Sequence, residues 1–136
     1  MNPLNTYLDH TLLKADATPE DILRVTEEAK EYHTASVCVN TCYAPLVAKA
    51  LRGSGVKTCV VVGFPLGAMA TAAKAQEAAL AVRDGAEEVD MVMNIGAAKA
   101  GDWAAVQTDI AAVVLAAKPA LVKVIIETCL LTDEQK

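Results

Sequence analysis

Short apolar runs alternate along the chain with longer segments in which apolar residues recur every three or four positions. The short runs are rich in β-branched residues and predict strands, whereas the longer, Ala-rich segments predict helices. Five strands are expected, at residues 7–13, 36–40, 57–64, 88–94 and 121–127. Four helices are expected between them, at residues 19–32, 44–51, 71–84 and 103–117.

Capping and turn residues support these boundaries. Thr18 is a suitable N-cap, with Pro19 at the first helical position and Asp21 three residues after the cap. Residues 63–67 (GFPLG) match neither a Walker loop nor GxGxxG, so they predict a tight turn after the third strand. Residues 94–97 predict a similar turn after the fourth strand, and residues 132–134 resemble the cap and first turn of a further helix.

Strands that alternate with helices predict a parallel sheet with right-handed crossovers. The continuous apolar character of residues 60–62 and 124–126 indicates strands that are buried on both faces. Two architectures fit, an open five-stranded α/β sheet or part of a (β/α)₈ TIM barrel. A complete barrel needs roughly 200–250 residues. We therefore expect residues 1–136 to form a single truncated barrel domain, with the C-terminal part of the barrel absent.

Composition and charge exclude several classes of protein. With 54% hydrophobic and 21% charged residues, the chain is not intrinsically disordered. Its net charge is −5 and its basic residues are scattered, which argues against nucleic acid or an anionic membrane surface as a partner. No apolar stretch approaches 18 residues and no signal peptide precedes the first strand, so a cytoplasmic location is expected.

Four cysteines, Cys38, Cys42, Cys59 and Cys129, lie in or beside apolar runs. They are expected to be reduced, buried thiols, with Cys38 and Cys59 mainly filling the core. Cys38 and Cys42 have no second close pair and both His residues are remote, so no zinc site is expected. We expect no metal and no cofactor.

Polar residues inside apolar strands are the candidates for chemistry. Lys123 is the only lysine expected to be buried, and Asp90 is its nearest expected partner because both are flanked by apolar residues. Such a pair fits a functional site and equally a structural ion pair that fixes strand register. Asp9 and Thr11 share one face of the first strand, while His10 on the other face is expected to pack or hydrogen-bond.

Several ordered strings resemble bacterial 2-deoxyribose-5-phosphate aldolase, from residue 7 to residue 134. They are Leu8-Asp9-His10-Thr11-Leu12-Leu13, Val37-Cys38-Val39-Asn40, Val62-Gly63-Phe64-Pro65-Leu66-Gly67, the sequence from Gly85 to Ala97, and Lys123-Val124-Ile125-Ile126-Glu127-Thr128. Thr71, Lys74 and Glu77 in the third helix also match.

The resemblance implies a (β/α)₈ barrel and a metal-free class I aldolase of deoxyribonucleotide and carbohydrate degradation. The family reversibly cleaves 2-deoxyribose 5-phosphate into acetaldehyde and glyceraldehyde 3-phosphate through a lysine Schiff base. By this resemblance Asp90 works in the proton relay and Lys123 is a second interior lysine. Asp9 and Thr11 lie at the edge of the substrate site, and Cys38 lies near it.

The departures from the family pattern bear on activity. Thr41 replaces a usual proline, which is a minor change. The Schiff-base lysine of the family lies on the sixth strand in a Val-Lys-Thr-Ser-Thr-Gly type motif, and this string is absent from the 136 residues, as are the later lysine and the phosphate-binding loops. We therefore expect this chain alone to be inactive or nearly so.

Two alternatives to this interpretation remain open. In one, the chain is a non-catalytic half-barrel that binds or assembles, forming a homo-oligomer through its exposed barrel edges. In the other, Lys123 has taken over as the Schiff-base residue.

Overall fold

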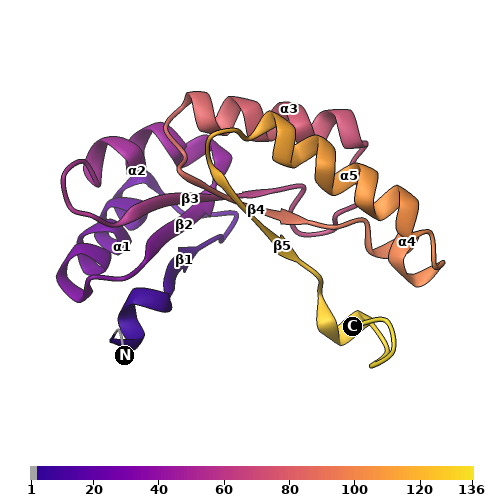
Figure 1. Ribbon diagram of the computed structural model, residues 1–136. Coiled ribbons are helices and arrows are strands. Elements are labelled where there is room, and N and C mark those ends of the chain that lie inside the picture. Colours follow the sequence, from indigo (N-terminus) through magenta and orange to yellow (C-terminus); the bar gives the residue numbers. More distant parts are fainter. Residues whose placement is uncertain (1–2) are drawn as a thin grey trace.

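The computed structural model describes residues 3–136, which form one mixed α/β unit (Figure 1). Its strands are β1 (Asp9–Leu12), β2 (Ser36–Asn40), β3 (Lys57–Val62), β4 (Glu88–Val92) and β5 (Leu121–Ile125). Its α-helices are α1 (Pro19–Tyr32), α2 (Ala44–Ala50), α3 (Thr71–Arg83), α4 (Ile95–Lys99) and α5 (Trp103–Ala116). Three short 3₁₀ helices are η1 (Leu4–Tyr7), η2 (Thr41–Tyr43) and η3 (Thr128–Leu130).

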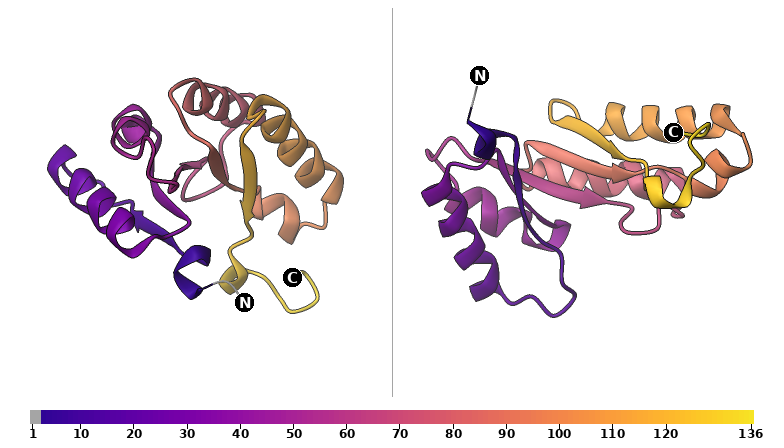
Figure 2. Two further views of the ribbon diagram at one scale, coloured as in Figure 1. Left: turned by 60° about the vertical axis from the view of Figure 1, so that its left-hand side comes forward. Right: turned by 90° about the horizontal axis from the view of Figure 1, so that it is seen from below.

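The five strands form one parallel sheet in the order β1-β2-β3-β4-β5. An open, doubly wound sheet reverses its strand order and carries helices on both faces, whereas here the order is sequential and the helices form an outer layer on one face (Figure 2). The sheet also curves so strongly that Lys123 on β5 reaches Asp9 on β1, with 2.6 Å between Nζ and Oδ2. The fold is therefore a partial (β/α)₈ barrel.

Most predicted elements are confirmed, and the differences lie at their ends. Strands β3, β4 and β5 end two residues earlier than expected. The turn predicted at residues 94–97 is wrong, because Asn94 caps the short helix α4 by accepting a hydrogen bond from the Ala97 N–H at 3.0 Å. The cap and first turn predicted at residues 132–134 are present: residues 133–135 form a turn, the Thr132 hydroxyl accepts from the Gln135 N–H at 3.3 Å, and the Thr132 N–H donates to the Gln135 side chain at 3.0 Å.

The N-terminus of α1 has the predicted capping arrangement. The Thr18 hydroxyl accepts a hydrogen bond from the Asp21 backbone N–H, and the Asp21 carboxylate in turn accepts one from the Thr18 backbone N–H. Two backbone donors that would otherwise lack a partner are satisfied in this way, so the helix begins at a defined residue.

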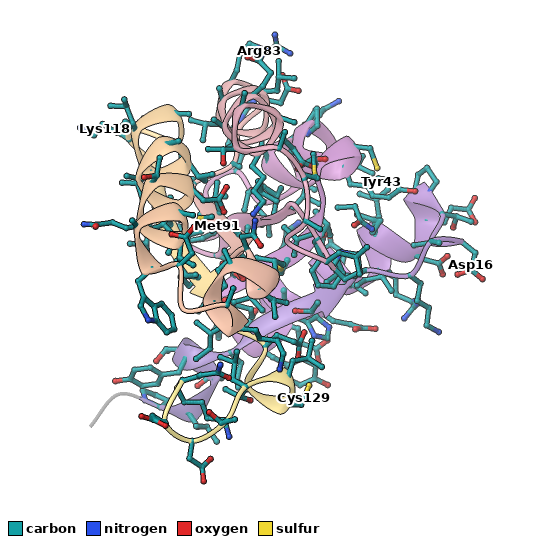
Figure 3. All side chains as sticks on the ribbon, turned by 90° about the vertical axis from the view of Figure 1, so that its right-hand side faces the viewer. Asp16, Tyr43, Arg83, Met91, Lys118 and Cys129 are labelled. Atoms are coloured by element: carbon teal, nitrogen blue, oxygen red, sulfur yellow. The ribbon has the colours of Figure 1, made fainter. Side chains whose placement is uncertain are left out.

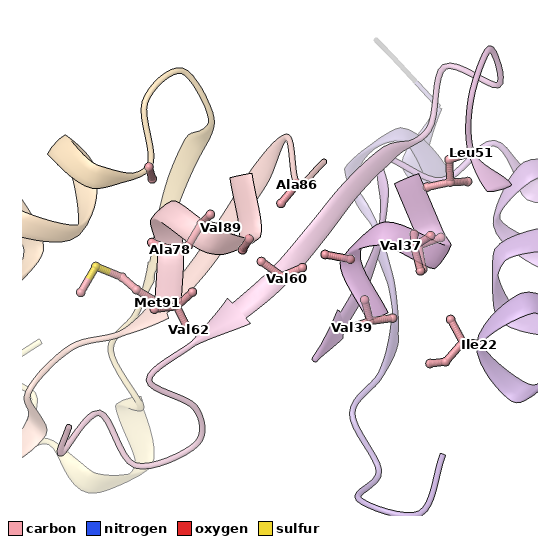
Figure 4. Close-up of a cluster of buried hydrophobic side chains, with 14 of the residues drawn as sticks. Ile22, Val37, Val39, Leu51, Val60, Val62, Ala78, Ala86, Val89 and Met91 are labelled. Carbon is pink, nitrogen blue, oxygen red and sulfur yellow. The ribbon is translucent and has the colours of Figure 1, made fainter. Parts of the chain in front are cut away.

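The apolar core lies between the outer face of the sheet and the helices (Figures 3 and 4). Met91 lies inside this layer, whereas Arg83 and Lys118 project from the ends of α3 and α5 (Figure 3). Val37, Val60 and their neighbours are fully buried, and each such side chain contributes roughly 1.5–3 kcal/mol relative to an exposed one. Strand β5 departs from the expected burial on both faces, because most of its residues keep partial exposure.

Lys74 is fully buried, so the expectation that Lys123 is the only buried lysine is wrong. Its Nζ donates hydrogen bonds to Asp109 Oδ2 at 2.6 Å and to the Val92 carbonyl at 3.0 Å. The Thr71 hydroxyl donates to the other Asp109 oxygen at 2.9 Å. This network joins α3, α5 and the carboxyl end of β4, and it fixes how the two helices sit on the sheet.

No helix within residues 3–136 is both long enough and apolar enough to cross a membrane.

Candidate active site

The inner face of the sheet, which carries no helices, is polar where the outer face is apolar. Side chains alternate along each strand, so the residues between the core valines all point inward. Seven polar residues of this face lie close to Lys123 or to its carboxylate partners, and they come from all five strands: Asp9, Ser36, Cys38, Cys59, Glu88, Asp90 and Lys123. This set is the candidate site.

Lys123 lies at the centre of this set and contacts three carboxylates. Its Nζ donates to Asp9 Oδ2 at 2.6 Å and lies 3.1 Å from Glu88 Oε2 and 3.2 Å from Asp90 Oδ1. The predicted contact with Asp90 is present, but the hydrogen-bonded partner is Asp9. Glu88 was not among the predicted residues, although it shares a strand face with Asp90 and the alternation of β4 could have identified it.

The surrounding carboxylates determine the protonation state of Lys123. Burial lowers the pKa of Lys123, but the hydrogen bond to Asp9 and the nearby Glu88 and Asp90 carboxylates outweigh it, so the pKa is raised. The amine is therefore held as an ammonium. Its side chain is 34% exposed, so Lys123 is less buried than expected.

Asp9 and Asp90 are shifted in opposite directions. Burial raises the pKa of Asp9, but hydrogen bonds from Lys123 and from the Ser36 hydroxyl, the latter at 2.6 Å, leave it lowered. Burial dominates at Asp90, whose pKa is raised because Lys123 offsets only part of the desolvation. Asp90 Oδ1 has no hydrogen bond despite its closeness to Lys123. One carboxylate thus binds the ammonium and has a lowered pKa, whereas the other has a raised pKa because it is buried.

The thiols of Cys38 and Cys59 lie beside Asp90. The Cys38 Sγ donates to Asp90 Oδ2 over 3.9 Å, and both cysteines pack with Val61, as expected for core residues. The hydrogen bond with Cys38 and burial raise the pKa of the Cys59 thiol. By contrast Cys42 and Cys129 are exposed, so the expectation that all four thiols are buried is wrong for these two.

Thr11 and His10 lie away from the lysine. The Thr11 hydroxyl donates to the Asp9 carbonyl at 3.0 Å, and Thr11 is exposed. His10 contacts Glu28 of α1, with 2.8 Å between Nε2 and Oε2, and this confirms the expected hydrogen-bonding role.

The loop after β3 is held at the carboxyl end of the sheet. The Gly67 N–H donates to the Gly63 carbonyl at 2.8 Å, which confirms the tight turn. Glu77 of α3 accepts from the Gly63 N–H at 2.9 Å and from the Thr41 hydroxyl at 3.2 Å. Sequence patterns did not indicate that Glu77 joins these two segments, because its partners lie 14 and 36 positions away in the chain.

Comparison with known proteins identifies the family of the chain. The DeoC/LacD aldolase family matches residues 4–136. Deoxyribose-phosphate aldolases from Clostridium novyi and Finegoldia magna are 62% and 59% identical, each over 133 residues, which is 97% and 98% of this chain. The chain spans 60% and 62% of the length of these two relatives.

Solved structures give the same result. An aldolase named QR15 superposes with a TM-score of 0.93 at 34% identity, covering 99% of this chain and 60% of its own. A tetrameric deoxyribose phosphate aldolase from Aeropyrum pernix gives 0.87 at 32% identity, covering 97% and 56%. By sequence and by fold, the chain belongs to the DeoC/LacD family of aldolases.

Proposed function

We propose that this chain supplies the first five βα units of a deoxyribose-phosphate aldolase. The reaction is the reversible cleavage of 2-deoxyribose 5-phosphate to acetaldehyde and glyceraldehyde 3-phosphate through a lysine Schiff base. Support comes from the family match and from the identity to aldolases over nearly all of this chain. The observation that carries the proposal is the inward cluster in which one ammonium contacts three carboxylates.

The proposed roles follow from the two kinds of environment in the cluster. Asp90, whose pKa is raised by burial, relays a proton between water and the substrate carbon. Lys123 places a fixed positive charge near the developing oxyanion, and Asp9 holds it there. Thr11 and Cys38 border the space that the sugar phosphate would occupy. The substrates are thus small aldehydes and sugar phosphates, and no cofactor is needed.

We propose further that the 136 residues alone have little or no aldolase activity. A Schiff base requires a neutral lysine placed at the carbonyl. Lys123 is held as an ammonium, and Lys74 is buried behind the sheet in its pair with Asp109. The motif that carries the Schiff-base lysine in the family does not occur in this sequence.

Reductive trapping tests the inactivity directly. The chain is incubated with acetaldehyde and cyanoborohydride at low molar excess, and its intact mass is measured, with the Clostridium novyi aldolase as the positive control. We expect an adduct on the control and no site-selective adduct on this chain. One stoichiometric adduct that maps to Lys123, and disappears in Lys123→Met, would show that Lys123 has taken over as the nucleophile.

A chimera tests the proposed function itself. Residues 1–136 are joined to the part of the Clostridium novyi aldolase that lies beyond the matched region, and retro-aldol turnover is measured. We expect turnover, and we expect Asp90→Asn to reduce kcat by about 10²–10⁴-fold, the usual contribution of a general acid or base. Asp84→Asn, a change at the partly exposed C-cap of α3 and outside the cluster, is the matched control. A folded chimera without turnover, or one in which Asp90→Asn is fully active, would contradict the proposal.

A second candidate role is self-assembly, which the strand edges favour. β1 and β5 each pair on one side only within the part of the chain that the structure describes. Unpaired edges and an uncovered sheet face promote association between chains. We expect an oligomer in light scattering at micromolar concentration, and a monodisperse monomer would contradict it.

Because all four cysteines are free, we place the protein in the reducing cytoplasm.

A further inference from the structure

Three donor atoms of the inner face lie close enough together to bind one metal ion. Cys38 on β2 and Cys59 on β3 are directly paired neighbours in the sheet. Their sulfur atoms and a carboxylate oxygen of Asp90 on β4 all lie within 4.8 Å of one another. The sequence argument against zinc considered the Cys38–Cys42 spacing and the remote His residues, and it could not detect donors brought together by three separate strands.

The spacing of these donors is near that of a tetrahedral site. A zinc ion with Zn–S bonds of about 2.3 Å holds two sulfur atoms about 3.8 Å apart and a carboxylate oxygen slightly nearer. The Cys38 Sγ already lies 3.9 Å from Asp90 Oδ2. All three residues are on strands of one sheet, and sites built on strands are held more precisely than sites on loops.

The charge around the donors favours a divalent cation. Asp9, Glu88 and Asp90 surround Lys123, so with all four groups ionised the cluster has a net charge of −2. Lys123 lies next to Asp90 Oδ1, whereas Cys38 lies next to Oδ2. The oxygen that faces the thiols is therefore the one not occupied by the ammonium. The Asp90 side chain is 14% exposed, whereas Cys38 and Cys59 are 3% and 0% exposed, so an ion would reach the two thiols from the side of Asp90.

We propose that Cys38, Cys59 and Asp90 form a binding site for a borderline-soft divalent ion, Zn²⁺ or Cd²⁺, with water in the fourth position. Two thiolates and one carboxylate are donors that such ions prefer. On binding, two metal–sulfur bonds replace two S–H bonds, and the two protons pass to the solvent. No electron is transferred. The proposal concerns binding alone and does not depend on the proposed aldolase reaction.

Cadmium titration tests the site with a spectroscopic readout. The parent protein carries Cys42→Ser and Cys129→Ser, which remove the two exposed thiols and leave the inner pair. Thiolate-to-cadmium charge transfer is followed in the ultraviolet, and proton release is followed in weak buffer. We expect both signals to saturate at one Cd²⁺ per chain, with two protons released per ion, and Zn²⁺ to displace the bound cadmium.

Substitutions in the parent identify the donors. Cys38→Ser and Cys59→Ser should each weaken binding by more than the roughly 10–100-fold that changes around a metal site cause. Asp90→Asn should weaken it while leaving the charge-transfer band at saturation. Val61→Ala, in the same packed cluster but without a donor atom, is the matched control and should bind as the parent does.

Two results would overturn the proposal. One is a parent protein that shows no charge-transfer band saturating at one Cd²⁺ per chain. The other is a folded Cys38→Ser or Cys59→Ser variant that binds as tightly as the parent. Should either cysteine variant fail to fold by circular dichroism, the stoichiometry and proton release of the parent, together with Asp90→Asn, decide the question.

Discussion

The buried ion pair between Lys74 and Asp109 offers a direct test of how α3 and α5 are held on the sheet. Lys74→Met keeps an unbranched apolar stem and removes the ammonium, so Asp109 keeps only the Thr71 hydroxyl as a partner. Both side chains are at least 96% buried, because Lys74 is 0% exposed and Asp109 is 4% exposed. Removing one member of a buried pair costs about 3–5 kcal/mol, since an uncompensated charge stays in the interior.

Urea denaturation followed by far-ultraviolet circular dichroism measures this loss. With a slope of about 2 kcal/mol per molar urea, a loss of 3–5 kcal/mol lowers the unfolding midpoint by about 1.5–2.5 M. Lys74→Met/Asp109→Leu removes both charges and should recover most of the loss, to within about 2 kcal/mol of the unmodified chain.

Lys49→Met makes the same chemical change on the exposed side of α2. It should change stability by no more than about 0.5 kcal/mol. The reasoning would be refuted if Lys74→Met were as stable as this control, or if the double variant were less stable than the single one.

Three more perturbations probe the loops and the inner cluster. Gly67→Ala would place a Cβ 1.9 Å from the Met93 carbonyl oxygen, at a φ of +65°, whereas Gly53→Ala, at a φ of +79°, has open space around it. In thermal unfolding, Gly67→Ala should therefore lower the free energy of unfolding by at least about 1 kcal/mol more than Gly53→Ala does. Equal losses would contradict the close packing of this turn. Glu77→Ala should cost about 1.5–3 kcal/mol and speed hydrogen exchange at the Gly63 amide, and unchanged exchange would show that the contact is unimportant. The pKa of Asp9 is lowered from 3.8. The ion pair of Asp9 therefore stabilises the fold above about pH 3.8, and this stabilisation is lost as the pH falls below that value. Asp9→Asn should therefore flatten the urea midpoint profile below about pH 4, whereas parallel profiles would be inconsistent with the pair.

Local pattern predicted the fold well where burial and periodicity agree. Ser36–Asn40 and the cap at Thr18 lie where they were expected, because both depend on neighbouring residues. The predicted C-terminal ends of β3, β4 and β5 were two residues too late. The strand-like pattern of apolar residues continues into the loops, where the chain has already left the sheet. Asn94 caps a five-residue helix that contains a glycine, and so short an element has little periodicity to detect.

The sequence predicted most residues of the candidate site, but not which of them contact one another. Alternation placed Asp90 and Lys123 on inward faces, but the partner of Lys123 at hydrogen-bond distance is Asp9, across the curved sheet. Curvature is a property of the whole sheet and cannot be predicted from the sequence of any one strand. The burial of Lys74 was missed for a similar reason. It depends on α5, which begins 29 positions later and contains the partner residue Asp109.

The sequential strand order also bears on how the chain acquires its structure during synthesis. Every strand pairs with the one made just before it, so each βα unit can add to the sheet as it emerges, without waiting for a distant segment. The hydrogen bond between Lys123 and Asp9 is the exception, since it spans 114 positions. It forms only after β5 has been made, so the contact that links the two edge strands of this sheet comes after the strand pairings that precede β5.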